Sequence, residues 1–198
     1  AFAADRTGFF YVTVPAPPQL KDHCVHEIAC TALHEGYPGH HLQFLAAQAQ
    51  LSPVRRIVSS PLMVEGWALY CEELMTEHGF LARPEEQFFQ RLHLLWRALR
   101  VVLDIRLHTT GMTFEEAVRA MVETLGIERA SAEAEVRRYC ATPTYNLCYA
   151  VGRRDLVRLR DDVRRRDGAS FSLRKFHDEV LTYGGLPVAL IRWGMGWG

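Results

Sequence analysis

The chain has 198 residues, of which 48% are hydrophobic, and its 23 basic side chains (Lys and Arg) balance 23 acidic ones (Asp and Glu). This length suits one domain with a sizeable core, or the catalytic part of a larger protein. The balanced charge argues against a general nucleic-acid-binding protein, and no apolar run reaches the roughly 18 residues that a membrane-spanning helix needs.

The first predicted element is a short strand. Residues 8–14, GFFYVTV, are aromatic and β-branched, and prolines at positions 15, 17 and 18 follow them. The preceding residues lack the basic segment and apolar run of a signal peptide. They also lack the pattern of a first helix, so we expect the chain to be part of a longer protein.

The remaining residues have the apolar spacing of helices. A helical stretch over 20–50 is interrupted by Gly36, Pro38 and Gly39. Further helices are predicted over 62–78, 84–110, 131–140, 143–166 and 171–183, and a capping box at Thr113–Glu116 starts another, whereas the final RWGMGWG has no predicted structure. The expected fold class is therefore mainly α, with a small β element near the N-terminus, in one domain spanning 1–198.

A run of charged residues indicates the character of one helix surface, and the cysteines indicate the cellular compartment. The alternating charges of 153–167 fit the solvated, ion-paired face of a helix, with an anion-binding face as the alternative. The cysteines are odd in number, form no CxxC pair and lie among apolar residues: Cys24, Cys30, Cys71, Cys140 and Cys148. We expect buried free thiols and a cytoplasmic location. A cysteine metal site or disulfide framework, and a secreted or lipid-anchored full-length form, stay open.

The strongest functional signal is HEGYPGHH, which contains His34, Glu35, His40 and His41. A zinc hydrolase needs two neutral imidazoles that share an ion, and a carboxylate beside them that handles a water proton. The usual helical arrangement of these groups is HExxH, with the histidines one turn apart. That arrangement is absent here because position 38 is proline.

In a regular helix neither pair of histidines can share an ion. His34 and His40 would be about 9 Å apart along the axis and point in different directions, and His34 and His41 about 10.5 Å apart. Pro38 and Gly39 are residues that distort helices. We therefore predict a kink or bulge between 36 and 39 that brings His40 to His34, with His41 as the alternative ligand.

A third ligand is expected from the segment VEGWALYCEEL at 64–74. Glu65 starts an otherwise apolar helix, where metal coordination would offset the cost of burying an acid. Glu72, two turns further on the same face, is predicted to orient a histidine. Asp104 and His108, one turn apart on a later helix, are predicted to belong to a supporting network rather than to a second metal site.

Four segments together resemble one known family. TALHEGYPGHHLQ, EGWALYCEE, CYAVGRRDLVRLR and FSLRKFHDEVLTYGGLP are similar to the bacterial family catalogued as domain of unknown function 885, which is regarded as zinc-peptidase-like. EGWALYCEE also resembles the aminopeptidase N segment whose glutamate is the third zinc ligand. The resemblance strengthens a site of His34, His40 and Glu65. It also implies that this is the C-terminal catalytic portion of a longer protein, whose N-terminal part packs on it.

The expected protein is a gluzincin-like metallopeptidase with one Zn²⁺. It would cleave peptide or related amide bonds by a metal-activated water, with Glu35 as general base. Tyr149 and His177, in the late segments that match the family, are candidate donors to the oxyanion, and Tyr145 is the reserve. Alternatives are a metal-dependent amidase for a small non-peptide metabolite and a catalytically silent structural or binding domain. Neither a nucleic-acid partner nor a membrane span is expected.

Overall fold

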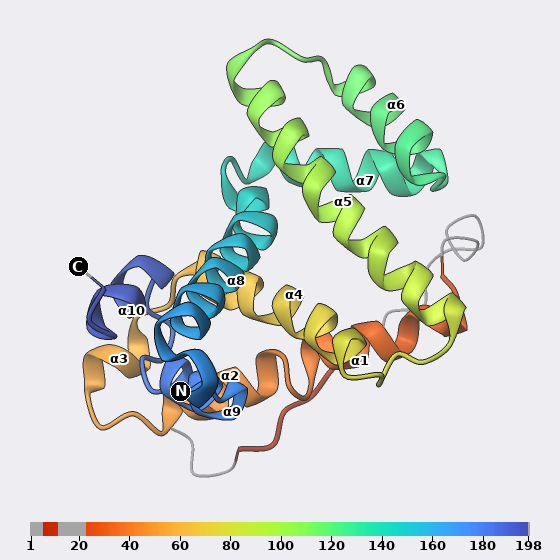
Figure 1. Ribbon diagram of the computed structural model, residues 1–198. Coiled ribbons are helices and arrows are strands. Elements are labelled where there is room, and N and C mark those ends of the chain that lie inside the picture. Colours follow the sequence, from red (N-terminus) through yellow and green to blue (C-terminus); the bar gives the residue numbers. More distant parts are fainter. Residues whose placement is uncertain (1–5, 12–22, 198) are drawn as a thin grey trace.

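The structure is a computed structural model that describes residues 6–11 and 23–197 (Figure 1). The helices in chain order are α1 (Ile28–Glu35), α2 (His40–Gln48), α3 (Pro53–Ile57), α4 (Pro61–Glu77), α5 (Pro84–Thr109), α6 (Phe114–Leu125), α7 (Arg129–Ala141), α8 (Cys148–Asp167), α9 (Leu173–Leu181) and α10 (Val188–Gly194). Short 3-10 helices precede α1 (η2, Val25–Glu27), precede α8 (η3, Tyr145–Leu147) and follow it (η4, Gly168–Ser170). The predicted mainly α class is confirmed.

The predicted β element is not found in the described part of the chain. There the only β pairing is an isolated parallel bridge between Ser59 and Gly185. Phe9, Phe10 and Tyr11 are exposed and belong to no strand, and residues 12–14 lie outside the described residues. A β-branched, aromatic segment forms a strand only where a neighbouring strand supplies hydrogen-bond partners, and none of the described residues supplies them here.

Helix α4 runs through the middle of the protein and makes its most extensive contact with α8 (Figure 1). Two glycines allow this close crossing. A Cβ on Gly152 would lie 1.9 Å from the carbonyl oxygen of Leu62, and one on Gly66 would lie 2.4 Å from the carbonyl carbon of Gly152. The crossing thus fixes the backbone of Glu65, next to Gly66, against α8.

The main core lies around this crossing. Its large buried side chains come from α4, α8, α9 and α10, and include Trp67, Tyr70, Leu156 and Ile191. A second core lies between α5, α6 and α7, the group of helices at the top of Figure 1. The predicted capping box starts α6, because the Thr113 hydroxyl accepts from the Glu116 amide (3.2 Å) while the Glu116 carboxylate accepts from the Thr113 amide (2.8 Å).

The predicted helices agree with the structure except at the start of α8 and at two short elements. The helix predicted over 143–166 begins only at Cys148, after a turn in which Thr144 has a φ of 70° and a 3-10 helix at Tyr145–Leu147. Helix α3 has five residues and α10 has seven, and neither was predicted. The final segment RWGMGWG was expected to have no regular structure, and this prediction is wrong for its first residues, which lie in α10. Such short segments contain too few turns to show a period, and α10 is stabilised by burying Val188 and Ile191 in the main core.

The cysteines and the charge run largely follow expectation. All five cysteines are free; Cys30, Cys71 and Cys148 are buried, but Cys140 is exposed on α7, which corrects the prediction of uniform burial. In the charge run, Arg153 pairs with Glu73 through Nε at 2.9 Å. No helix of the described chain has the length and apolar character of a membrane span.

Candidate metal centre

A tight turn separates α1 from α2 at the position where the sequence predicts a distortion. The amide of Gly39 donates to the carbonyl oxygen of Leu33 at 3.0 Å, and a Cβ on Gly39 would lie 1.9 Å from the carbonyl oxygen of His34. The indole Nε1 of Trp67 on α4 donates to the carbonyl oxygen of Pro38 at 2.9 Å. The turn is therefore packed against α4, and only glycine fits at position 39.

The turn brings His40 back beside His34. The two imidazole rings have centroids 4.7 Å apart and lie nearly perpendicular, at 88°. Oε2 of Glu65 on α4 lies 3.7 Å from Nε2 of His34 and 3.5 Å from Nε2 of His40. The predicted distortion is confirmed, and the structure brings together the three residues that the sequence singled out as ligands.

These three side chains fit a zinc ion. One ligand atom from each residue lies within 4.8 Å of the other two. Tetrahedral zinc with bonds of about 2 Å requires ligand atoms roughly 3.3 Å apart, so small side-chain movements would complete the set. Burial alone would raise the pKa of Glu65, but hydrogen bonds with His34, His40 and Tyr145 hold its pKa well below the usual range. The carboxylate is therefore ionised, as a ligand must be.

Glu72 supports His34 from the other side of the ring. Its Oε1 lies 2.7 Å from Nδ1 of His34, and its Oε2 accepts from the Cys30 thiol at 3.2 Å. Burial would raise the pKa of Glu72, but the charge of Arg97 and the hydrogen bond with His34 outweigh it and lower the pKa. An ionised acceptor at Nδ1 leaves Nε2 of His34 free to face Glu65 and the metal position.

A second group of possible ligands shares Glu72. Atoms of Cys30, Glu72 and His93 also lie within 4.8 Å of one another. Burial and the neighbouring Glu72 raise the pKa of the Cys30 thiol, and a metal here would compete with the contacts of Glu72 with Cys30 and with His34. The group of His34, His40 and Glu65 is therefore the better site.

The candidate centre opens into a pocket of about 510 Å³. Glu35, next to the candidate ligand His34, lines this pocket, and Tyr145 and Tyr149 line it from η3 and α8. The Tyr145 hydroxyl donates to Oε1 of Glu65 at 2.6 Å. Tyr145, the reserve candidate from the sequence, is thus in direct contact with a candidate ligand.

Asp104 of α5 holds the turn that carries Tyr145. Its two carboxylate oxygens accept from the Thr144 amide and from the Asn146 side chain, each at 2.9 Å. His108 lies beside Asp104, with Nδ1 3.4 Å from Oδ1, and does not line the pocket. Asp104 thus acts through the position of Tyr145, in the supporting network that the sequence indicated.

The structure does not bring His177 to the pocket. Nε2 of His177 lies 2.7 Å from the Tyr70 hydroxyl, and the ring packs edge-on against Trp67. Burial and the charge of Arg160 lower the pKa of His177 to about 4. His41 is also outside: its ring contacts Tyr37 and lines an adjoining cavity rather than the pocket of the candidate ligands.

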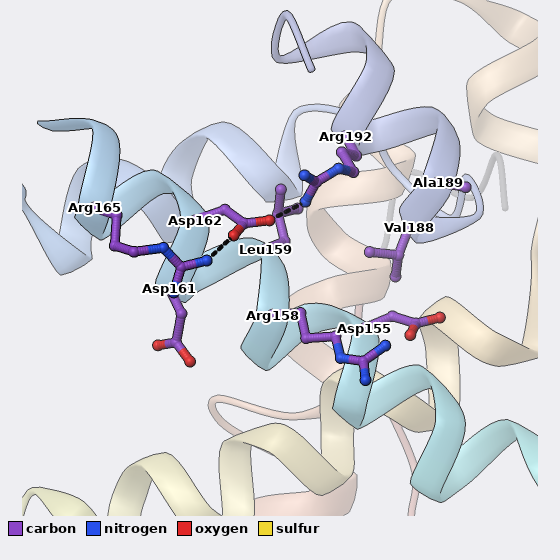
Figure 2. A pocket seen from close by; sticks show the side chains of 9 residues that line it. All are labelled: Asp155, Arg158, Leu159, Asp161, Asp162, Arg165, Val188, Ala189 and Arg192. Atoms are coloured by element: carbon purple, nitrogen blue, oxygen red, sulfur yellow. Dashed lines mark hydrogen bonds and ion pairs between the residues drawn. The ribbon is translucent and has the colours of Figure 1, made fainter. Parts of the chain in front are cut away.

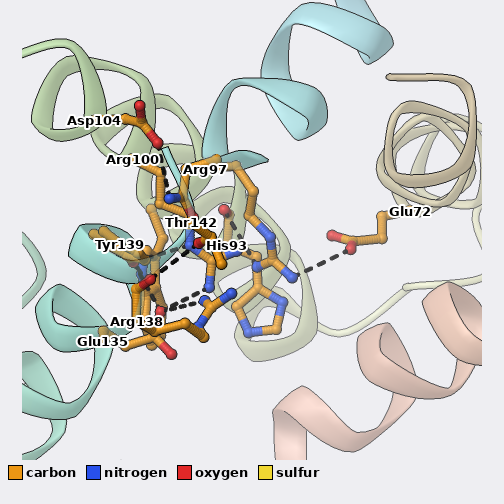
Figure 3. A network of polar contacts seen from close by, with 11 residues as sticks. Glu72, His93, Arg97, Arg100, Asp104, Glu135, Arg138, Tyr139 and Thr142 are labelled. Atoms are coloured by element: carbon orange, nitrogen blue, oxygen red, sulfur yellow. Dashed lines mark hydrogen bonds and ion pairs between the residues drawn. The ribbon is translucent and has the colours of Figure 1, made fainter. Parts of the chain in front are cut away.

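Two arginines of α5, Arg97 and Arg100, line the pocket and were not predicted as site residues. Figure 3 shows Arg97 directed toward Glu72, while Arg100 points into a network with Glu135 and Tyr139. A signal was present in the sequence, because Arg97, Arg100 and Asp104 follow one another at helical spacing on the helix that also holds the turn before α8.

A separate cavity, between α8 and α10, is lined by acidic and basic side chains that neutralise one another. Figure 2 shows Asp162 between Arg165 and Arg192, and ion pairs join it to both. This is the surface of the charge run at 153–167. Its pairing favours the solvated, ion-paired interpretation over an anion-binding face.

The fold and the site together define a mainly helical protein with a two-histidine, one-glutamate candidate metal centre. The chain belongs to the family described as bacterial protein of unknown function (DUF885), whose model matches residues 2–195.

Two solved structures are similar to this chain. One, a proposed lipoprotein from Colwellia psychrerythraea, is 34% identical, with a TM-score of 0.84 over 87% of this chain. The other, a proposed lipoprotein of unknown function from Shewanella oneidensis, is 32% identical, with a TM-score of 0.77 over 84%. The chain spans 30% and 31% of those two proteins, so it corresponds to less than a third of each. No curated protein matches the chain.

Proposed function

We propose that this domain is a zinc-dependent hydrolase that cleaves peptide or related amide bonds. The observation that carries the proposal is the convergence of His34, His40 and Glu65 beside Glu35, in one pocket. Two imidazoles and one carboxylate are the ligand set of gluzincin-type peptidases and favour zinc over harder metals. Bound zinc would supply a Lewis acid that polarises a carbonyl and lowers the pKa of a water molecule.

The chain's own residues supply proton transfer and orientation. Glu35 would accept a proton from the attacking water and pass it to the leaving amine. Glu72 keeps the His34 ring oriented through its 2.7 Å contact with Nδ1. Tyr145, with its hydroxyl 2.6 Å from Glu65, is the donor best placed to stabilise the developing oxyanion, and Tyr149 is the second candidate in the pocket.

Replacement of Glu35 tests this function. Glu35→Gln keeps the size of the side chain but removes the base, so zinc stays bound while kcat falls by about 100- to 10,000-fold. Glu123→Gln, an exposed acid on α6 outside the pocket, is the matched control and keeps the wild-type rate. A Glu35→Gln variant that retains full activity would overturn the mechanism.

A panel of peptides and acyl amides separates the proposed peptidase from a small-metabolite amidase. Hydrolysis of acyl amides without hydrolysis of peptides favours the amidase. Zinc binding without hydrolysis of any of them favours a silent binding domain.

Within a longer protein we propose that other parts pack on this domain. The cytoplasmic location stays a prediction, and a lipid-anchored form is the alternative suggested by the two relatives described as proposed lipoproteins.

A further inference from the structure

Hydrolysis as proposed above gives Arg97, which lines the pocket beside Glu72, no role toward the substrate. We infer that Arg97 binds a free carboxylate of the substrate, so that the domain acts on peptides or acyl amino acids whose C-terminus is close to the cleaved bond. This inference rests on the proposed function, because it assigns the substrate class of the same pocket. Arg97 is thereby a specificity-determining residue.

The guanidinium of Arg97 is only loosely held by the protein. Its side chain is 14% exposed, and its NH2 group lies 3.9 Å from Oε1 of Glu72, beyond hydrogen-bond distance. That carboxylate oxygen already contacts Nδ1 of His34 at 2.7 Å. NH1 donates to the carbonyl oxygen of His93 at 3.3 Å, and the buried Nε has no hydrogen-bond partner among the described residues. Donors of a buried guanidinium are costly to leave unpaired, so this group favours an added anion.

Arg100, one turn further along α5, is held more firmly, although the Arg97 guanidinium also lies over the Tyr149 ring, 6.0 Å from its centroid. Nε of Arg100 donates to the Tyr139 hydroxyl at 3.0 Å and its NH2 to Glu135 at 3.0 Å, and its guanidinium lies 5.0 Å from the ring centroid of Tyr149. These contacts hold Arg100 in place and give it a structural partner. Of the two arginines, Arg97 is therefore the one available to a ligand, and Arg100 adds positive charge behind it (Figure 3).

The two cavities beside the metal position have opposite character. The pocket with Arg97 adjoins a second cavity of about 520 Å³, and Glu35, His40 and Phe44 line both. The second cavity is lined in addition by Phe9, Phe10 and Ala32. A substrate spanning both would have its scissile bond at Glu35 and His40, its carboxylate toward Arg97 and an apolar acyl portion toward the phenylalanines.

The size of the pocket that Arg97 lines limits the distance between the substrate's carboxylate and the cleaved bond. About 510 Å³ is within the range of cavities that hold small ligands, roughly 300–1,000 Å³. A pocket of this size accommodates a leaving segment of one or a few residues whose carboxylate lies in the part that Arg97 lines. The geometry thus points to cleavage near a C-terminus rather than inside a chain.

Matched acid and amide probes test the inference. Calorimetry on the zinc-loaded protein compares N-acetyl-phenylalanine with its C-terminal amide, and kinetics compare a short peptide with the same peptide amidated. We expect the acid to bind, and the free-acid peptide to react, about 10- to 100-fold better. Arg97→Met removes this preference, Arg97→Lys retains part of it, and Arg153→Met, which removes an ion-paired arginine of α8 outside the pocket, leaves it unchanged.

Each contrary result has a separate meaning. Equal binding of acid and amide to the wild-type protein overturns the inference. So does an acid preference that survives in Arg97→Met, because the carboxylate would then bind the metal. Equal loss of acid and amide binding in Arg97→Met makes Arg97 a positioning residue and also overturns it. Absence of hydrolysis contradicts the proposed function alone, since the binding comparison still tests Arg97.

Discussion

Oε1 of Glu72 lies 2.7 Å from Nδ1 of His34, and the nearest acid to Nε2 of the same ring is Glu65 at 3.7 Å. One imidazole is thus held between two carboxylates from one helix, two turns apart. Burial would lower the pKa of His34, but hydrogen bonds with Glu65 and Glu72 outweigh it and raise the pKa. With a metal bound, Glu72 would keep the ring oriented while Nε2 of His34 would serve as the ligand atom.

Removal of the charge of Glu72 is expected to weaken zinc binding without abolishing it. We expect Glu72→Gln to raise the zinc dissociation constant about 10- to 100-fold, because an amide orients His34 less strongly than a carboxylate does. Competition with a chromophoric chelator measures this constant. Glu73→Gln, the neighbouring acid that pairs with Arg153 instead, is the matched control. Equal affinities for the two variants would mean that the contact with Nδ1 has no effect on the metal.

Tyr145 and Tyr149 can be separated by their phenylalanine variants. Tyr145→Phe is expected to lower kcat by about 100- to 1,000-fold with zinc still bound, because it removes the donor nearest the candidate ligands. Tyr149→Phe is expected to have a smaller effect, since Tyr149 lies against the Arg100 guanidinium. Steady-state kinetics with one substrate compare them, and the reverse order of effects would assign the donor role to Tyr149.

The crossing of α4 and α8 tolerates no side chain at Gly152. Gly152→Ala places a methyl group 1.9 Å from a backbone oxygen of α4, so we expect the free energy of unfolding to fall by about 3 kcal/mol. Gly126→Ala is the control for backbone conformation alone: its φ is +69°, but nothing lies within 4 Å of the added carbon, and the expected cost is about 1 kcal/mol. Denaturant unfolding gives both values, and equal losses would argue against the close crossing.

His177 makes stability depend on pH in the acid range. Its pKa is lowered from 6.5 to about 4 in the folded protein, so the unfolded chain binds the proton more readily between these values. The stabilisation is therefore full above pH 6.5 and is lost as the pH falls toward 4, by about 1–3 kcal/mol.

Substitution of His177 removes this dependence. His177→Gln is expected to flatten the fall in unfolding free energy between pH 7 and 4.5 relative to wild type. Chemical unfolding at several pH values measures the slope. His108→Gln, an imidazole beside Asp104 rather than Tyr70, should keep the wild-type slope in that window. An unchanged slope in His177→Gln would show that the ring is not held neutral by burial.

Sequence reasoning singled out the candidate ligands because helix geometry is simple enough to be tested against spacing. In a regular helix His34 and His40 cannot share a metal ion, and this mismatch predicted the turn at Pro38 and Gly39. Glu65 and Glu72 were found because acids within an apolar helix require partners. The strand at 8–14 was wrong in its described part, because strand formation depends on a neighbour that local composition does not reveal.

Long-range packing was the part that the sequence did not show. His177 and Tyr149 both lie in segments that match the family, yet only Tyr149 lines the pocket. His177 of α9 contacts Tyr70 and Trp67 of α4 instead, and a contact between separate helices is not visible from spacing. The helical spacing of Arg97 with Asp104 was visible in the sequence, but the contact of Arg97 with Glu72 was not, since it joins residues of two different helices.

Zinc content of the purified, zinc-loaded protein and its single variants tests the central claim most directly. We expect one zinc ion per wild-type chain by elemental analysis after dialysis, and its loss in His40→Ala and Glu65→Ala. His41→Ala and His93→Gln should retain it. Zinc kept by His40→Ala and Glu65→Ala but lost from His93→Gln would assign the ion to Cys30, Glu72 and His93 instead, and a wild-type protein that binds no zinc would contradict the account entirely.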